Sequence, residues 1–171
     1  MQRVVRSLLL VAVATSMVSA TRSYAQDEPS IGTGAVFVMT NAADRNTVIS
    51  FRRAVDGSLR ESRRVSTGGR GTGGVTDPLE SQGSLTVSQD HALLFAVNGG
   101  SGEISVFQVH GSQLTLVDKE TSGGGEPNAV AQHGNLVYVL NVGGSSNVVG
   151  FRLNAGGATS ESPQFDSFSY H

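Results

Sequence analysis

The sequence predicts an all-β protein built as a partial β-propeller, and three observations lead to this fold class. Glycine contributes 22 of the 171 residues, proline only four and tryptophan none, a composition typical of short strands and tight turns. A hairpin-like unit recurs three times along the chain. The second strand of each unit is apolar at successive positions, as expected of a strand buried on both faces. Together they predict four-stranded antiparallel blades, about two and a half to three of them, packed face to face.

The start of the chain has the pattern of a secretory signal peptide. Arg3 and Arg6 precede an apolar run at residues 8–14, and small residues follow at two candidate cleavage positions, Ala20 and Ala25. The run is too short for a membrane span, which needs about 20 apolar residues. We therefore expect a signal peptide over residues 1–25, a periplasmic or secreted location, and no membrane contact after cleavage.

Charge and cysteine content narrow the classes of partner. Loss of the three arginines in the expected signal peptide lowers the formal net charge from −2 to −5. An acidic chain of this kind argues against nucleic acid and against an anionic membrane surface as partners. The sequence has no cysteine, so disulfides and thiol catalysis are excluded. The fold must be held by its core or by subunits.

The repeated unit is an apolar strand that ends in asparagine, a polar or glycine-rich turn, and a β-branched strand that ends in phenylalanine. Its three copies span residues 35–51, 92–107 and 136–151. The three asparagines are Asn41, Asn98 and Asn141. Strands that flank a turn of Asn, Asp, Gly and Ser predict a hairpin in each copy. The 43 residues between the second and third asparagines match the blade length of a propeller, about 40–50 residues.

Further strands complete the units. A strand precedes the second and third copies, within residues 84–98 and 127–141, and another follows the first and second, at residues 58–66 and 113–121. One complete unit therefore has four antiparallel strands, named A to D in chain order. The first unit lacks strand A, and residues 162–171 show no repeat character. We expect a flexible segment over 26–33, a partial propeller over 34–161 and a non-repeat tail over 162–171.

A glycine-rich stretch lies between strand D of the first unit and strand A of the second. Gly69, Gly71 and Gly74 have the G-x-G-x-x-G spacing of a dinucleotide site. That motif requires a helix directly after it, whereas Val75-Thr76-Asp77-Pro78 follows here. The sequence therefore predicts a mobile connector and no bound cofactor.

Alternation of strand direction determines which loops share a face. The B–C turns and D–A loops are expected at one end of the blades, and the A–B and C–D turns at the other. His91, His110 and His133 fall in the second group and are expected to be solvent-exposed turn residues. Their spacing offers no pair of metal ligands, so no metal site is predicted.

The blade segments resemble a known family. Residues 35–59, 66–74, 83–98 and 136–151 are similar to the seven-bladed β-propeller lactonases, a group that resembles phosphogluconolactonases and carboxymuconate cyclases. The resemblance covers about residues 34–157. It implies an exported lactonase-like hydrolase that acts on a sugar lactone or a related cyclic ester.

The chain departs from that family in two ways. Seven blades need about 300 residues, so the chain matches a truncated fragment of such a propeller. Related propeller lactonases often carry a Pro-x-His motif at strand A, and the matching stretch here is Pro127-Asn128-Ala129. The resemblance therefore transfers no catalytic histidine to this chain.

Four charged residues are the candidates for catalysis. Arg70, Asp77 and Glu80 lie in the long D–A loop, and Glu126 lies in the next D–A loop on the same face. Lactone hydrolysis needs a base to activate water and a donor to stabilise the oxyanion, roles that a carboxylate and an arginine can take. The same charges are also typical of any solvated loop.

Three functional hypotheses stay open. The chain belongs to a lactone-hydrolysing enzyme, or to a non-catalytic propeller that binds a carbohydrate-derived ligand or a scaffold partner, or it is a truncated product without independent activity. In each case an open arc of blades leaves unpaired sheet edges, so we expect self-association through them.

Overall fold

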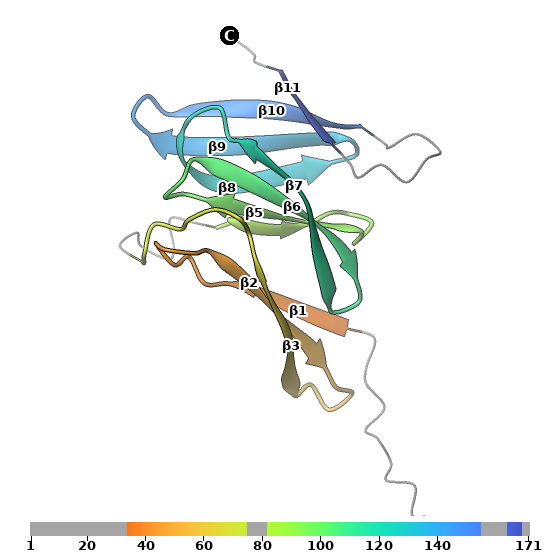
Figure 1. Ribbon diagram of the computed structural model, residues 1–171. Helices are drawn as coiled ribbons and strands as arrows, with labels where there is room; N and C mark the ends of the chain where they lie inside the picture. The colour runs from red at the N-terminus through yellow and green to blue at the C-terminus, as the bar shows by residue number, and fades with distance from the viewer. Residues whose placement is uncertain (1–33, 75–81, 155–163, 169–171) are drawn as a thin grey trace, which may run out of the picture.

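The computed structural model describes residues 34–74, 82–154 and 164–168. Within these ranges the chain forms three antiparallel sheets (Figure 1), and no helix is long and apolar enough to cross a membrane. The predicted all-β fold is confirmed, and three stacked sheets correspond to a partial propeller of about three blades. The expected signal peptide and the segment 26–33 lie outside the described residues.

The sheets follow one another in chain order. In the described residues the first sheet has three strands: β1 (Gly34–Met39), β2 (Thr47–Arg53) and β3 (Leu59–Ser66). The second has four: β4 (Leu85–Val87), β5 (Leu93–Asn98), β6 (Glu103–His110) and β7 (Gln113–Thr121). The third also has four: β8 (Gly125–His133), β9 (Leu136–Gly143), β10 (Asn147–Asn154) and β11 (Gln164–Phe168).

The third sheet has an outer strand that the repeat pattern did not reveal. β11 pairs antiparallel with β10, from Gly150 opposite Phe168 to Asn154 opposite Gln164. It lies inside residues 162–171, the stretch expected to be a non-repeat tail, so the propeller continues past residue 161. The reason is that pairing with the edge of β10 uses backbone groups, which any sequence except proline supplies.

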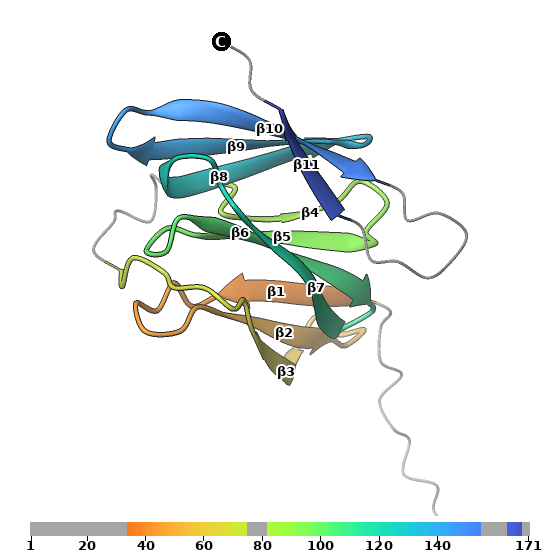
Figure 2. The same ribbon diagram turned by 45° about the horizontal axis from the view of Figure 1, so that its top comes forward.

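The second sheet is the centre of the stack (Figures 1 and 2). Leu94 and Ala96 of β5 belong to the core cluster shared with the first sheet, and Phe95 and Val97 belong to the cluster shared with the third. All four side chains are buried. The unbroken apolar run of β5 therefore supplies both cores, as its sequence predicted.

Hydrogen bonds from the residues that follow β3 and β7 join one sheet to the next. Thr67 follows β3, and its hydroxyl donates to Asn98 Oδ1 in the second sheet at 2.6 Å. Ser122 holds the same place after β7, and its carbonyl oxygen accepts from Asn141 Nδ2 in the third sheet at 3.1 Å. The four residues are buried. We call these contacts the Thr67–Asn98 joint and the Ser122–Asn141 joint.

The first unit departs from this arrangement. Its buried asparagine is Asn46, whose Nδ2 donates to Asn98 Oδ1 at 3.0 Å and to the Val97 carbonyl at 3.1 Å. Asn41, which the repeat pattern aligns with Asn98, is instead half-buried and has a left-handed backbone, with φ of 52°. In the first unit the side-chain amide that binds the second sheet is therefore that of Asn46, at the end of the B–C turn, and not that of Asn41 at its start.

Candidate functional site

The D–A loops and B–C turns lie at the same end of the sheets, as the strand directions predicted. Gly71 N donates to the Ala42 carbonyl at 2.8 Å, and Gly100 N donates to the Arg70 carbonyl at 3.0 Å. The long loop therefore lies between the B–C turns of the first and second sheets. We call this end of the molecule the loop face.

The histidines lie at the opposite end, where they were expected. His133 Nδ1 is 3.0 Å from Gln89 Nε2, a contact that links the A–B turns of the second and third sheets. At the same end, His91 lines a cavity of about 530 Å³ beside β1. Among the described residues, no group of three or more His, Asp or Glu side chains is placed to hold a metal ion.

The glycine-rich loop is a packed element over its described part, residues 67–74. A Cβ on Gly69 would lie 2.4 Å from Asn98 Cγ, and one on Gly71 would lie 2.2 Å from the backbone carbon of Asn41. A Cβ on Gly100 would lie 2.1 Å from the Gly71 carbonyl oxygen. The expectation of a mobile connector was wrong for these residues. Glycine is required at these positions because the backbone passes directly against neighbouring groups and leaves no room for a side chain. Close packing therefore explains the glycine spacing without a bound phosphate.

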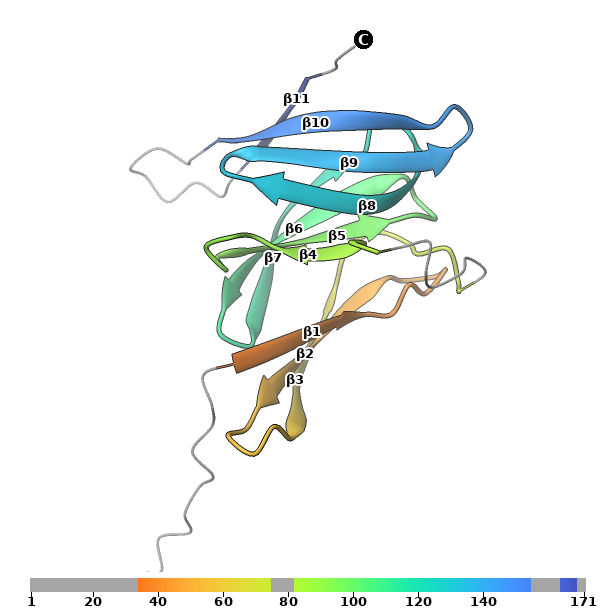
Figure 3. The ribbon, with the colours of Figure 1, turned by 180° about the vertical axis from the view of Figure 1, so that it is seen from behind.

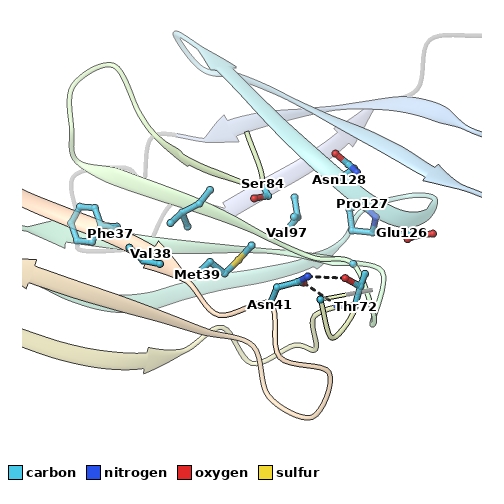
Figure 4. A pocket seen from close by; sticks show the side chains of 13 residues that line it. Phe37, Val38, Met39, Asn41, Thr72, Ser84, Val97, Glu126, Pro127 and Asn128 are labelled. Atoms are coloured by element: carbon cyan, nitrogen blue, oxygen red, sulfur yellow. Dashed lines mark hydrogen bonds between the residues drawn. The ribbon is translucent and has the colours of Figure 1, made fainter. Parts of the chain in front are cut away.

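A cavity of about 420 Å³ opens on the loop face between the first sheet and the beginnings of β4 and β8 (Figure 4). Its apolar lining is Phe37, Val38, Met39, Leu85, Val97 and Pro127. Its polar lining is Asn41, Thr72, Ser84, Glu126 and Asn128. An apolar pocket with a few convergent polar groups is the usual form of a small-molecule site.

One polar edge of the cavity is held by a pair of reciprocal hydrogen bonds. Asn41 Nδ2 donates to Thr72 Oγ1 at 2.7 Å, and Thr72 N donates to Asn41 Oδ1 at 2.9 Å (Figure 4). The left-handed backbone of Asn41 aims its side chain at the loop, a conformation that asparagine tolerates better than most residues. These two bonds fix the glycine-rich loop against the cavity.

Glu126 supplies the carboxylate of the cavity. It lies near the start of β8, it is exposed, and its φ of 51° places a non-glycine residue in the left-handed region. Such a backbone costs on the order of 1–3 kcal/mol, and residues of this kind cluster at active sites and ligand clamps. Asn128, two residues further along β8, is 8% exposed and lines the same cavity. A carboxylate and an amide therefore reach one cavity from one strand.

The other three charged candidates have different positions. Arg70 does not line the cavity: its backbone N donates to Ser101 Oγ at 2.9 Å, and its Nη2 is 3.5 Å from the Gly100 carbonyl oxygen. The turn at Gly99 and Gly100 lies between Arg70 and Glu126. Asp77 and Glu80 lie outside the described residues.

The Arg70 side of the loop face carries an ion pair that fastens the glycine-rich loop. Lys119 Nζ donates to Glu103 and to the Gly68 carbonyl oxygen. Partial burial opposes ionisation of Glu103, but hydrogen bonds from Lys119 and the Ser101 hydroxyl outweigh it and hold the pKa of Glu103 below its ordinary value. This carboxylate therefore stays charged and keeps its partners in place at neutral pH.

Sequence reasoning missed the neutral polar groups of the cavity, Asn41, Thr72, Ser84 and Asn128. It selected residues by charge, and amides and hydroxyls have no such signature. Asn128 had one available signal, since it stands in Pro127-Asn128-Ala129, the stretch that matches the Pro-x-His motif of related propellers.

Comparison with known proteins agrees with the propeller fold. The family described as lactonase, 7-bladed beta-propeller, matches residues 34–164. A functionally unknown protein from Desulfotomaculum acetoxidans is similar in structure, with a TM-score of 0.54, 21% identity, and coverage of 83% of this chain and 43% of that one. The periplasmic gluconolactonase PpgL of Pseudomonas aeruginosa has a TM-score of 0.52 and 21% identity, with coverage of 78% and 38%.

A third similar structure is a Bacteroides uniformis protein whose assignment as a 6-phosphogluconolactonase is provisional. It has a TM-score of 0.54 and 17% identity, and the match covers 77% of this chain and 36% of that one. None of the curated proteins matches. The chain thus spans less than half the length of the solved structures that it resembles, and at these identities the likeness shows the fold.

Proposed function

The chain belongs to the seven-bladed β-propeller lactonase family, and we propose that it contributes to hydrolysis of a small sugar lactone or related cyclic ester at the cavity beside Glu126. The family match over residues 34–164 is the observation that carries this proposal. The cavity supports it, because it combines one carboxylate with amide and hydroxyl groups on an apolar floor.

In the proposed reaction Glu126 acts as the general base. Its carboxylate takes a proton from water as the water oxygen attacks the lactone carbonyl, and the negative charge moves to the carbonyl oxygen. The Asn128 amide is the group we assign to stabilise that oxygen. The ring C–O bond then breaks, and the proton returns from Glu126 to the departing alkoxide.

The charge of the lining supports a neutral substrate. Among the described lining residues Glu126 is charged, and none is Lys, Arg or His. A phosphorylated lactone would bring a negative charge close to this carboxylate without a cation to offset it. We therefore propose that an uncharged sugar lactone is preferred to its phosphate ester.

Export is part of the same proposal. The charged start, short apolar run and small-residue exits of residues 1–25 support a signal peptide, and one structural neighbour is a periplasmic enzyme. N-terminal sequencing of the protein recovered from a cell envelope fraction would test it. A chain that begins at Gln26 or at Thr21 is expected, and an intact Met1 would contradict export.

The test of function compares lactone opening by the full chain and by Glu126→Gln, with Glu120→Gln as the matched control. Glu120 is exposed on β7 and does not line the cavity. Turnover of gluconolactone above the spontaneous rate should fall by about 100-fold in Glu126→Gln and stay unchanged in Glu120→Gln. Equal rates in all three proteins would contradict the role of Glu126.

A non-catalytic binding module is the second candidate, and the absence of a histidine at Ala129 favours it. It predicts saturable binding of gluconolactone or gluconate without turnover. Binding that is weakened in Asn128→Ala, measured by calorimetry, together with no turnover above the spontaneous rate in the unsubstituted chain, would support that function in place of catalysis.

A further inference from the structure

The two ends of the stack carry apolar sheet faces that no described strand covers (Figures 1 and 3). At one end, on the first sheet, Val38 is 47% exposed and lies opposite Ile49. At the other end, on the third sheet, Leu140 and Val148 lie opposite each other and are 39% and 57% exposed. We call these the β1 face and the β9 face. Apolar side chains gathered on one face mark an interaction surface.

The β9 face repeats a surface that the molecule already buries. Leu140 pairs with Val148 across β9 and β10 in the way that Val97 pairs with Ile104 across β5 and β6, and an asparagine follows each first residue. Val97 and Ile104 are 4% and 0% exposed, because the third sheet covers them. The β9 face is therefore the type of surface on which a following sheet packs.

The β1 face repeats the opposite surface. Val36 pairs with Phe51, and Val38 with Ile49, in the register in which Leu94 pairs with Phe107 and Ala96 with Ser105. The second sheet buries Leu94, Ala96 and Phe107 completely against the first sheet. The β1 face is therefore the type of surface that packs on a preceding sheet.

We propose that a second copy of this chain packs its β1 face on the β9 face of the first, head to tail. The contact would continue the interface that the three sheets already make twice, and in both of those contacts unlike faces meet. A contact between unlike faces is heterologous, and it closes into a ring if the rotation between copies permits. Two copies packed in this way would place six of the described sheets in one continuous stack.

Single substitutions separate this arrangement from its alternatives. Val38→Lys places a charge on the β1 face, and Leu140→Lys places one on the β9 face. Val55→Lys is the control, because Val55 is 71% exposed in the turn after β2 and lies on neither face. Sedimentation velocity of the full chain should show association for the unsubstituted protein and for the control. Each face variant by itself should raise the dissociation constant by about 100-fold, because a lysine would be buried without a partner.

Mixing the two face variants is the decisive step. Val38→Lys keeps its β9 face and Leu140→Lys keeps its β1 face, so the mixture should form a one-to-one dimer although each variant is monomeric. Loss of association in one variant and not the other would mean that like faces meet, and would overturn the proposal. A monomeric unsubstituted chain, or a control that dissociates, would overturn it as well. If a lysine variant fails to fold, as judged by circular dichroism, Val38→Ser and Leu140→Ser provide the same comparison with a smaller change in dissociation constant.

Discussion

Asn98 is the residue at which the first two sheets are most firmly connected. It is fully buried, its Oδ1 accepts from Thr67 Oγ1 and from Asn46 Nδ2, and its Nδ2 donates to Ser105 Oγ at 2.8 Å. The Asn98 amide therefore bonds to three other segments: the turn before β2, the residue after β3, and β6. Asn46, Thr67 and Ser105 are themselves buried, so each of them would lose one hydrogen bond that water does not replace if the amide were removed.

Asn98→Ala should therefore lower the free energy of unfolding by about 3 kcal/mol, since several buried groups lose a partner at about 1 kcal/mol or more each. Asn135→Ala is the control, because Asn135 lies exposed in the turn before β9, and it should change stability by less than about 0.5 kcal/mol. Urea denaturation of both variants measures the difference. A loss of similar size in the two variants would show that the amide network contributes little.

Glu103 gives stability a dependence on acid pH. Its pKa is lowered in the folded chain, where the opposing effect of burial is outweighed by its hydrogen bonds with Lys119 and Ser101. A carboxylate of this kind stabilises the fold above its unfolded pKa, near 4.5, and the contribution is lost as the pH falls through the lower folded pKa.

Glu103→Gln should accordingly narrow the difference in melting temperature between about pH 6.5 and about pH 3. Glu120→Gln should leave that difference unchanged. Thermal unfolding at both pH values measures it, and an identical pH dependence in all three proteins would remove Glu103 from the explanation.

Among the elements, the glycine-rich loop differs most from its predicted character. Its sequence is typical of a mobile linker, because glycine allows the backbone many conformations where no neighbouring group restricts it. Here backbone hydrogen bonds to two B–C turns and the Asn41–Thr72 pair hold residues 67–74 in place. The strands of the second unit could be predicted because runs of β-branched and apolar residues are separated by short stretches of turn residues. Contacts between the loop and turns about 30 residues distant leave no such local pattern.

Gly71→Ala should be much more destabilising than Gly111→Ala. A Cβ at Gly71 would lie 2.2 Å from the backbone of Asn41. A Cβ at Gly111 would meet nothing within 4 Å, so the cost there comes only from a side chain at φ of 59°. We expect losses of about 3 kcal/mol and about 1 kcal/mol in the free energy of unfolding. Equal losses in urea denaturation would mean that the loop is not packed as described.

For the whole molecule, the sequence predicted the stack of sheets but a smaller part of the site. The repeat predicted strand order and the shared loop face, because strand direction follows from chain order. Glu126 was also selected from sequence, as a charge on that face. The remainder of the cavity depends on how neighbouring sheets pack, so the pairing of Asn41 with Thr72 could not be predicted from either residue.

The position of each sheet in the stack predicts how amide hydrogens exchange. Amides of β5 and β6 should exchange most slowly, because the second sheet is covered on both faces, and those of β2 and β10 should exchange earlier. The Val38→Lys variant is the suitable sample, since association would cover the ends. Uniform exchange across the three sheets would contradict a stack that opens from its ends.

The two joints have a consequence for the order in which the chain gains structure. The Thr67–Asn98 joint closes over 31 residues, and the Ser122–Asn141 joint over 19. Each links the end of one sheet to the sheet that the chain forms next, so the contacts between sheets are nearly as local as the sheets themselves. Local contacts favour fast folding, and a chain emerging from the ribosome can add one sheet at a time to those already formed.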